Sequence, residues 1–96
     1  MAKVNLSLQV LPTVPDKRIY PVVDRVIEMI KETGLYYVVG PFGTAIEGEL
    51  DELFEIIKKA QTICIDEGAE RVVSMIKIDY KKEGVTIDEK ISKYKW

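Results

Sequence analysis

Few side chains in this sequence are equipped for chemistry, and most of them are polar rather than reactive. Asn5, Ser7 and Gln9 alternate with apolar residues near the N-terminus, and Glu47 stands in the run Thr44-Ala45-Ile46-Glu47-Gly48. Amides, hydroxyls and carboxylates direct hydrogen bonds toward a bound partner. These residue types predict recognition of a small polar molecule.

Catalysis is disfavoured by the residues that the chain lacks. It has no histidine and a single cysteine, Cys64, which lies within an apolar helical pattern. A nucleophilic cysteine needs a nearby base, and one thiol makes neither an internal disulfide nor a metal site. The sequence also has no glycine-rich phosphate loop. We therefore expect a protein that is not an enzyme and has no cofactor, with Cys64 packed in the core.

Size and composition favour one globular domain over residues 1–96, since 47% of the residues are hydrophobic and 31% charged. The net charge of −2 and the lack of a basic block argue against a nucleic-acid partner. Lys90, Lys93 and Lys95 have helical spacing and are interpreted as a solvated face. No apolar segment is long enough to span a membrane, and the lone cysteine favours a cytoplasmic location.

Hydrophobic periodicity and turn residues divide the chain into six main elements and a short final helix. Pro21 suits the first turn of a helix, and Thr86 with Glu89 forms a capping box. The predicted strands are 3–11, 36–39, 44–48 and 71–80, and the predicted helices are 20–33, about 49–67, and a short one after Thr86.

This order predicts an α+β, ferredoxin-like βαββαβ sandwich, a four-stranded antiparallel sheet with two helices on one face, plus a short C-terminal helix. Strand alternation then places Asn5, Ser7, Gln9 and Glu47 on the face without the two long helices, together with Val73, Met75 and Lys77. This mixed face suits a cavity roofed by a second copy of the chain. An ordinary wet sheet or dimer face is the alternative, and Trp96 is expected to dock on this subunit or another.

Three segments resemble the small thiamine-binding-protein family, which is related to a two-repeat protein that binds thiamine and its hydroxymethylpyrimidine precursor. They are residues 40–48, Arg71-Val72 and 76–80, and the resemblance covers nearly the whole chain in length and element order. It implies a ferredoxin-like fold, a homo-oligomer that is commonly a tetramer of two dimers, and thiamine or its pyrimidine moiety as ligand. It implies no catalysis.

The chemistry of the ligand that the resemblance implies suggests roles for individual side chains. Glu47 would accept a hydrogen bond from the pyrimidine amine, and Asn5, Ser7 or Gln9 would serve the ring nitrogens. The candidate ligand-binding residues are Glu47, Ser7, Asn5, Gln9, Thr44, Tyr36 and Phe42, the aromatic ones as a face for the thiazolium cation. Three alternatives stay open: an ion pair between Glu47 and Lys77, aromatic side chains that serve the core or an interface, and a structural or regulatory homo-oligomer without a small-molecule ligand.

Overall fold

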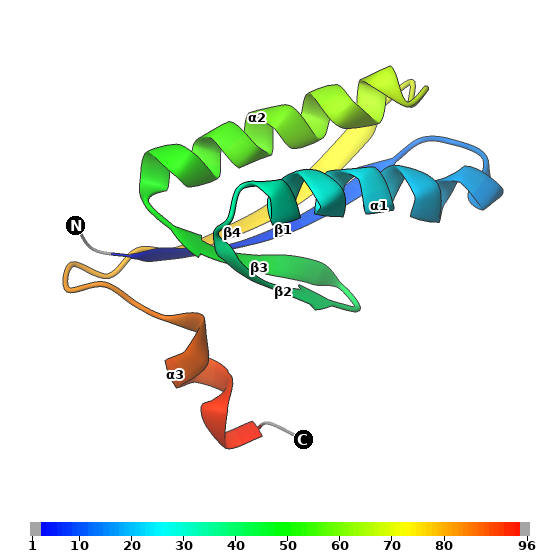
Figure 1. The fold of residues 1–96 in the computed structure, drawn as a ribbon. Coiled ribbons are helices and arrows are strands. Elements are labelled where there is room, and N and C mark those ends of the chain that lie inside the picture. Colours follow the sequence, from blue (N-terminus) through cyan, green and yellow to red (C-terminus); the bar gives the residue numbers. More distant parts are fainter. Residues whose placement is uncertain (1–2, 95–96) are drawn as a thin grey trace.

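The computed structural model of this protein describes residues 3–94 (Figure 1). Its elements are β1 (Val4–Pro12), α1 (Asp16–Glu32), β2 (Tyr36–Gly40), β3 (Gly43–Gly48), α2 (Leu50–Asp66), β4 (Val72–Asp79), α3 (Ile87–Ile91) and the 3₁₀ turn η1 (Ser92–Tyr94). The predictions for Trp96 and Lys95 lie outside the described residues.

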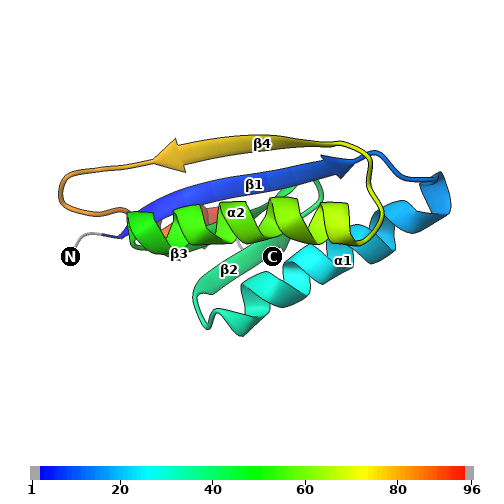
Figure 2. The same ribbon diagram turned by 90° about the horizontal axis from the view of Figure 1, so that it is seen from above.

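The four strands form one antiparallel sheet in the order β2-β3-β1-β4. Both long helices cover one face of this sheet, and α3 lies on the opposite side (Figure 1). In the view from above, α2 runs over the middle of the sheet, and β4 forms the edge of the sheet to one side of α2 (Figure 2). The predicted α+β class and ferredoxin-like arrangement are confirmed.

The core explains why β1 alternates so strictly. Val4, Leu6, Leu8 and Val10 are all buried on the side that faces α1 and α2. Burying an aliphatic side chain of this size contributes about 1.5–3 kcal/mol, so a register shift of one residue would be very costly. Cys64 is fully buried in the same cluster, as predicted, and this burial raises the pKa of its thiol.

Helix α1 begins four residues before the predicted start, so the placement of Pro21 in its first turn is wrong. Pro21 lies inside the helix, where it has no N–H to donate to the turn before it. The extra first turn of α1 is stabilised by the end of α2. Arg18 donates to the Glu67 carbonyl at 3.1 Å and pairs with the Glu67 carboxylate at 3.4 Å. This contact across the structure compensates for the local weakness at the proline.

Helix α3 begins at the predicted capping box. The Glu89 N–H donates to Thr86 Oγ1 at 3.2 Å, and the Thr86 N–H donates to Glu89 Oε1 at 2.9 Å. Before the helix, the Val85 N–H donates to the Lys3 carbonyl at 3.1 Å, which returns the chain to the sheet. Within residues 3–94, no helix is both long and apolar enough to cross a membrane.

Candidate functional site

Strand register arranges the sheet face opposite α1 and α2 into rows of side chains, and we call this side the open face. The row nearest α3, termed the α3 row, contains Tyr36, Glu47, Asn5 and Asp79. The middle row contains Val38, Ala45, Ser7 and Lys77. Beside the β2–β3 turn, the hairpin row contains Gly40, Gly43, Gln9 and Met75.

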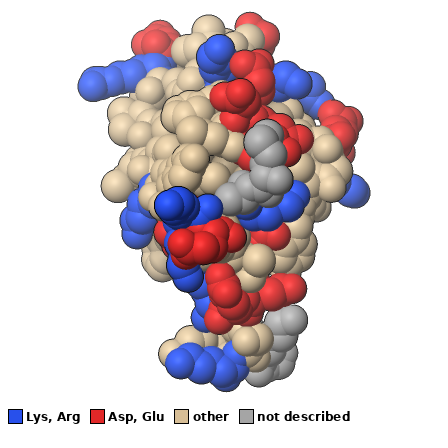
Figure 3. All heavy atoms as spheres, turned by 90° about the vertical axis from the view of Figure 1, so that its left-hand side faces the viewer, with Lys and Arg blue, Asp and Glu red and all other residues tan. Residues whose placement is uncertain are grey.

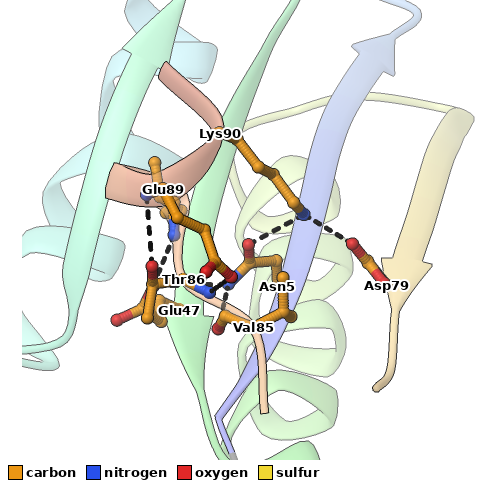
Figure 4. Close-up of polar contacts among 8 residues, drawn as sticks. Asn5, Glu47, Asp79, Val85, Thr86, Glu89 and Lys90 are labelled. Atoms are coloured by element: carbon orange, nitrogen blue, oxygen red, sulfur yellow. Dashed lines mark hydrogen bonds and ion pairs between the residues drawn. The ribbon is translucent and has the colours of Figure 1, made fainter. Parts of the chain in front are cut away.

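The α3 row is tied to the C-terminal helix through Lys90 (Figure 4). The Lys90 ammonium lies 2.6 Å from the Asp79 carboxylate and donates to Asn5 Oδ1 at 2.9 Å. Asn5 in turn donates through Nδ2 to the Val85 carbonyl at 3.3 Å and to Glu47 Oε1 at 3.4 Å. Asn5 is buried at the centre of this network, with 6% of its surface exposed.

Glu47 and Tyr36 complete the attachment of α3. Glu47 Oε1 accepts a hydrogen bond of 2.7 Å from the Ile87 N–H, at the first residue of the helix. The Tyr36 hydroxyl donates to Asp88 Oδ1 at 2.7 Å. That hydrogen bond is the main reason the pKa of Tyr36 is raised; desolvation and the charges of Asp88 and Glu47 act in the same direction.

The structure corrects one expectation about the open face and extends another. The view that covering it requires a second subunit is wrong for the end near Asn5, because α3 of the same chain lies there. Lys90 is exposed, as the prediction of a solvated face requires, but its ammonium also binds Asn5 and Asp79, which the prediction did not include. Lys77 lies in the middle row and makes no ion pair with Glu47 among the described residues.

A hollow of about 400 Å³ lies between α3 and the sheet. Ala45, Ile87 and Ile91 supply apolar wall; Leu6 and Ile78 also border the hollow, although their side chains belong to the opposite face of the sheet. Five polar side chains also line it: Asn5, Ser7, Lys77, Asp79 and Lys90. Apolar walls with a few directed polar groups are typical of small-molecule sites.

A second hollow, of about 340 Å³, continues along the open face toward the β2–β3 turn. It shares Ser7, Ala45 and Lys77 with the first hollow and is otherwise lined by Val38 and residues 40–43. We call the two together the open-face groove. The groove has room there because Ser7 and Ala45, the middle-row residues on the central strands β1 and β3, have small side chains.

Gly43 keeps the hairpin end of this groove clear. A Cβ atom at this position would lie 3.3 Å from Ser7 Oγ and 3.4 Å from the Leu8 carbonyl oxygen, which is tighter than ordinary contact. Its φ of 154° also lies in a range that favours glycine. The side chain of any larger residue would crowd the Ser7 hydroxyl, which lines the groove.

The predicted site residues divide into three groups. Asn5, Ser7, Glu47 and Tyr36 come together on the open face, though only Asn5 and Ser7 line the hollow beneath α3. Gln9 lies farther along in the hairpin row, and Phe42, 83% exposed, lines the hairpin half of the groove.

Thr44 does not join this site. It is buried on the opposite face, where it pairs with Leu8 and lines a smaller, mainly apolar hollow of about 190 Å³ beneath α1. Because side chains alternate along a strand, Thr44 and Glu47 were already expected on opposite faces. Thr44 was a candidate only because it belongs to the run Thr44–Gly48 that resembles the family.

Sequence reasoning did not assign Lys90, Asp79, Ile87 or Ile91 to the site. The capping box located α3 along the chain, but nothing in the local pattern showed where that helix docks. Charges of both signs are interspersed on the side of the molecule where α3 lies (Figure 3). A pair such as Lys90 and Asp79 is therefore not distinguishable from its neighbours by charge pattern alone.

Comparison with known proteins places this geometry in a family. The family described as "Thiamine-binding protein" matches residues 6–95. A UPF0045 protein from Clostridium perfringens is 60% identical over 91 residues, covering 95% of this chain and 96% of that protein.

Two solved structures share the fold. A domain of unknown function from Bacillus cereus has a TM-score of 0.91 and 46% identity, covering 98% of this chain and 91% of its own. A protein from Thermotoga maritima, provisionally assigned to thiamine biosynthesis or salvage, has a TM-score of 0.89 and 43% identity, covering 97% and 99%. With its sequence matched from the first strand to beyond α3, the chain belongs to the thiamine-binding protein family.

Proposed function

We propose that this protein is a non-enzymatic, self-associating binder of thiamine or its hydroxymethylpyrimidine moiety, and that the open-face groove is the binding site. The observation that carries the proposal is the hollow of about 400 Å³ between α3 and the sheet. Small-molecule sites commonly measure about 300–1,000 Å³, so this hollow has room for a two-ring ligand. Family membership supplies the ligand class.

The contacts around the groove favour different ligand partners from those the sequence indicated. Glu47 accepts from the Ile87 N–H and Asn5 accepts from Lys90, both on α3, and Glu47 is not among the residues that line the hollow. Asp79 does line it, and its carboxylate can accept from the pyrimidine amine while it also holds Lys90. The Ser7 hydroxyl, on the floor between both halves of the groove, is suited to a ring nitrogen.

Self-association is supported by the edge strand β4. Val73 and Met75 are 45% and 57% exposed on the open side, and Ile76 and Ile78 are 39% and 41% exposed on the helix side. An exposed edge strand with apolar side chains on both faces is a template for pairing with another chain. Pairing there would bring a second copy next to Lys77 and Asp79 at the rim of the groove.

Calorimetry with a blocked groove tests the ligand proposal. Ala45 lies on the floor that both halves share, so Ala45→Phe fills the groove while a strand still accommodates the aromatic ring. We expect saturable heats with thiamine or hydroxymethylpyrimidine for the native protein, and a loss of affinity of at least tenfold in Ala45→Phe.

Thr62→Phe is the control, because Thr62 is exposed on α2, on the other side of the sheet. It should bind like the native protein. Absence of heat with both ligands in the folded native protein, or native affinity in Ala45→Phe, would contradict the proposal.

A further inference from the structure

From the distribution of charge along the open-face groove, we infer that it selects a phosphorylated ligand and that Lys77 contacts the phosphate. This inference rests on the proposed function and names the form of ligand that the same site takes. Three ionisable side chains line the hollow beneath α3: Lys77, Asp79 and Lys90. Which of these three groups form ion pairs with each other determines the net charge next to a bound ligand.

Asp79 and Lys90 neutralise each other, since their charged groups are 2.6 Å apart. Lys77 is exposed and forms no ion pair within residues 3–94. Among the described side chains that line the groove, the net charge is therefore a single positive one. A free cationic ligand gains nothing from it, whereas a phosphate gains a charge-assisted hydrogen bond.

The remaining carboxylates near this face are held at the α3 end. Glu47 accepts from the Ile87 N–H and from Asn5, and Asp88 accepts from Tyr36. Among the described residues, Lys77 is the only ionisable side chain that lines the hairpin half of the groove. A negatively charged group of the ligand is thus favoured in the hairpin half of the groove, next to Lys77, and disfavoured in the half beneath α3.

Ser7 adds a second donor at the same place. Ser7 and Lys77 are directly opposite each other on β1 and β4, and both line the two halves of the groove. Directly opposite residues have Cβ atoms about 4.5–5.5 Å apart, so a hydroxyl and an ammonium there can reach one phosphate group together. The ring of the ligand would lie under α3 and its phosphate would point toward the hairpin.

The test compares matched ligand pairs by calorimetry at low and at physiological salt. Thiamine is compared with thiamine monophosphate, and hydroxymethylpyrimidine with its monophosphate. We expect the phosphorylated member of at least one pair to bind about tenfold tighter or more, with a gap that narrows as salt screens the charge. Lys77→Gln should reduce the gap between the two members of a pair to about twofold or less.

Lys17→Gln is the matched control, because Lys17 is an exposed lysine in the first turn of α1 on the other side of the sheet. It should keep the gap. Equal or weaker binding of both phosphorylated ligands, or a gap that survives in Lys77→Gln, would overturn the inference and leave thiamine binding intact. Failure of all four ligands to bind would overturn both proposals.

Discussion

A single buried amide, Asn5, joins β1 to three separate parts of the chain. Its side chain contacts Glu47 on β3, the Val85 carbonyl before α3, and Lys90 on α3. An amide can donate and accept at once, which neither a carboxylate nor an ammonium can do in its charged form. Replacing it therefore leaves donors and acceptors from different elements unpaired at the same time.

Asn5→Ala should lower the free energy of unfolding by about 1–3 kcal/mol, because it leaves the Val85 carbonyl and Lys90 without this partner. Urea unfolding followed by circular dichroism measures the change. Gln9→Ala is the control: Gln9 is half-buried on the same face of β1 and makes no side-chain hydrogen bond within the described residues. A loss as small as that of Gln9→Ala, about 0.5 kcal/mol or less, would show that the network is not a stabilising one.

At the scale of elements, α3 is attached to the sheet by polar contacts more than by apolar packing. Ile87 is buried, but Lys90, Asp88 and Glu89 are exposed. The ion pair between Lys90 and Asp79 is half exposed on both sides and so contributes at most about 1 kcal/mol. Several weak contacts, each with a small free energy, therefore hold α3 on the sheet. Conditions that change the charge of one of these groups should weaken the attachment.

Alkaline pH provides such a condition through Tyr36. The pKa of Tyr36 is raised by its hydrogen bond to Asp88, so the bond is intact at neutral pH and is lost as pH rises through the raised value. In a titration of tyrosinate absorbance, one tyrosine should ionise later than an unstructured tyrosine. Asp88→Asn should shift that step to lower pH, because the largest cause of the shift is removed.

Asp51→Asn is the comparison for this titration, since Asp51 is an exposed carboxylate in the first turn of α2. It should leave the late step in place, and Tyr36→Phe should delete it. If the late step persists in Tyr36→Phe, another tyrosine causes it and the contact between Tyr36 and Asp88 is not what shifts the pKa.

Local patterns predicted the elements well but not the way α3 docks. Alternation in β1 and the stripes of both long helices follow from burial against a single core, which is why Val4, Leu6 and Leu8 were placed correctly. The start of α1 was missed because Arg18 and Glu67, 49 residues apart, stabilise its first turn. Lys90 and Asn5, 85 residues apart, set the site by the same kind of distant contact.

At the scale of the whole molecule, the exposed edge strand bears on assembly. The double variant Met75→Lys, Ile78→Lys puts charge on both faces of β4, and burying unpaired charge in an interface is expensive. Sedimentation velocity should show the native protein as an oligomer and the double variant shifted to monomer. Ile65→Lys, at a residue 49% exposed on α2, should sediment like the native protein.

Circular dichroism must show the double variant folded for this comparison to count. A native protein that sediments as a monomer at every concentration would contradict self-association. An oligomer unaffected by the two lysines would instead place the contact between copies away from β4.

Helix α3 follows β4 in the chain and adds little to the core, because Ile87 is its one buried residue among those described. The sheet and both long helices are thus complete without it, and yet it forms one wall of the groove. Ile91 lines the groove and is only half-buried, so substitutions at this position can reshape what the groove accepts at little cost to folding.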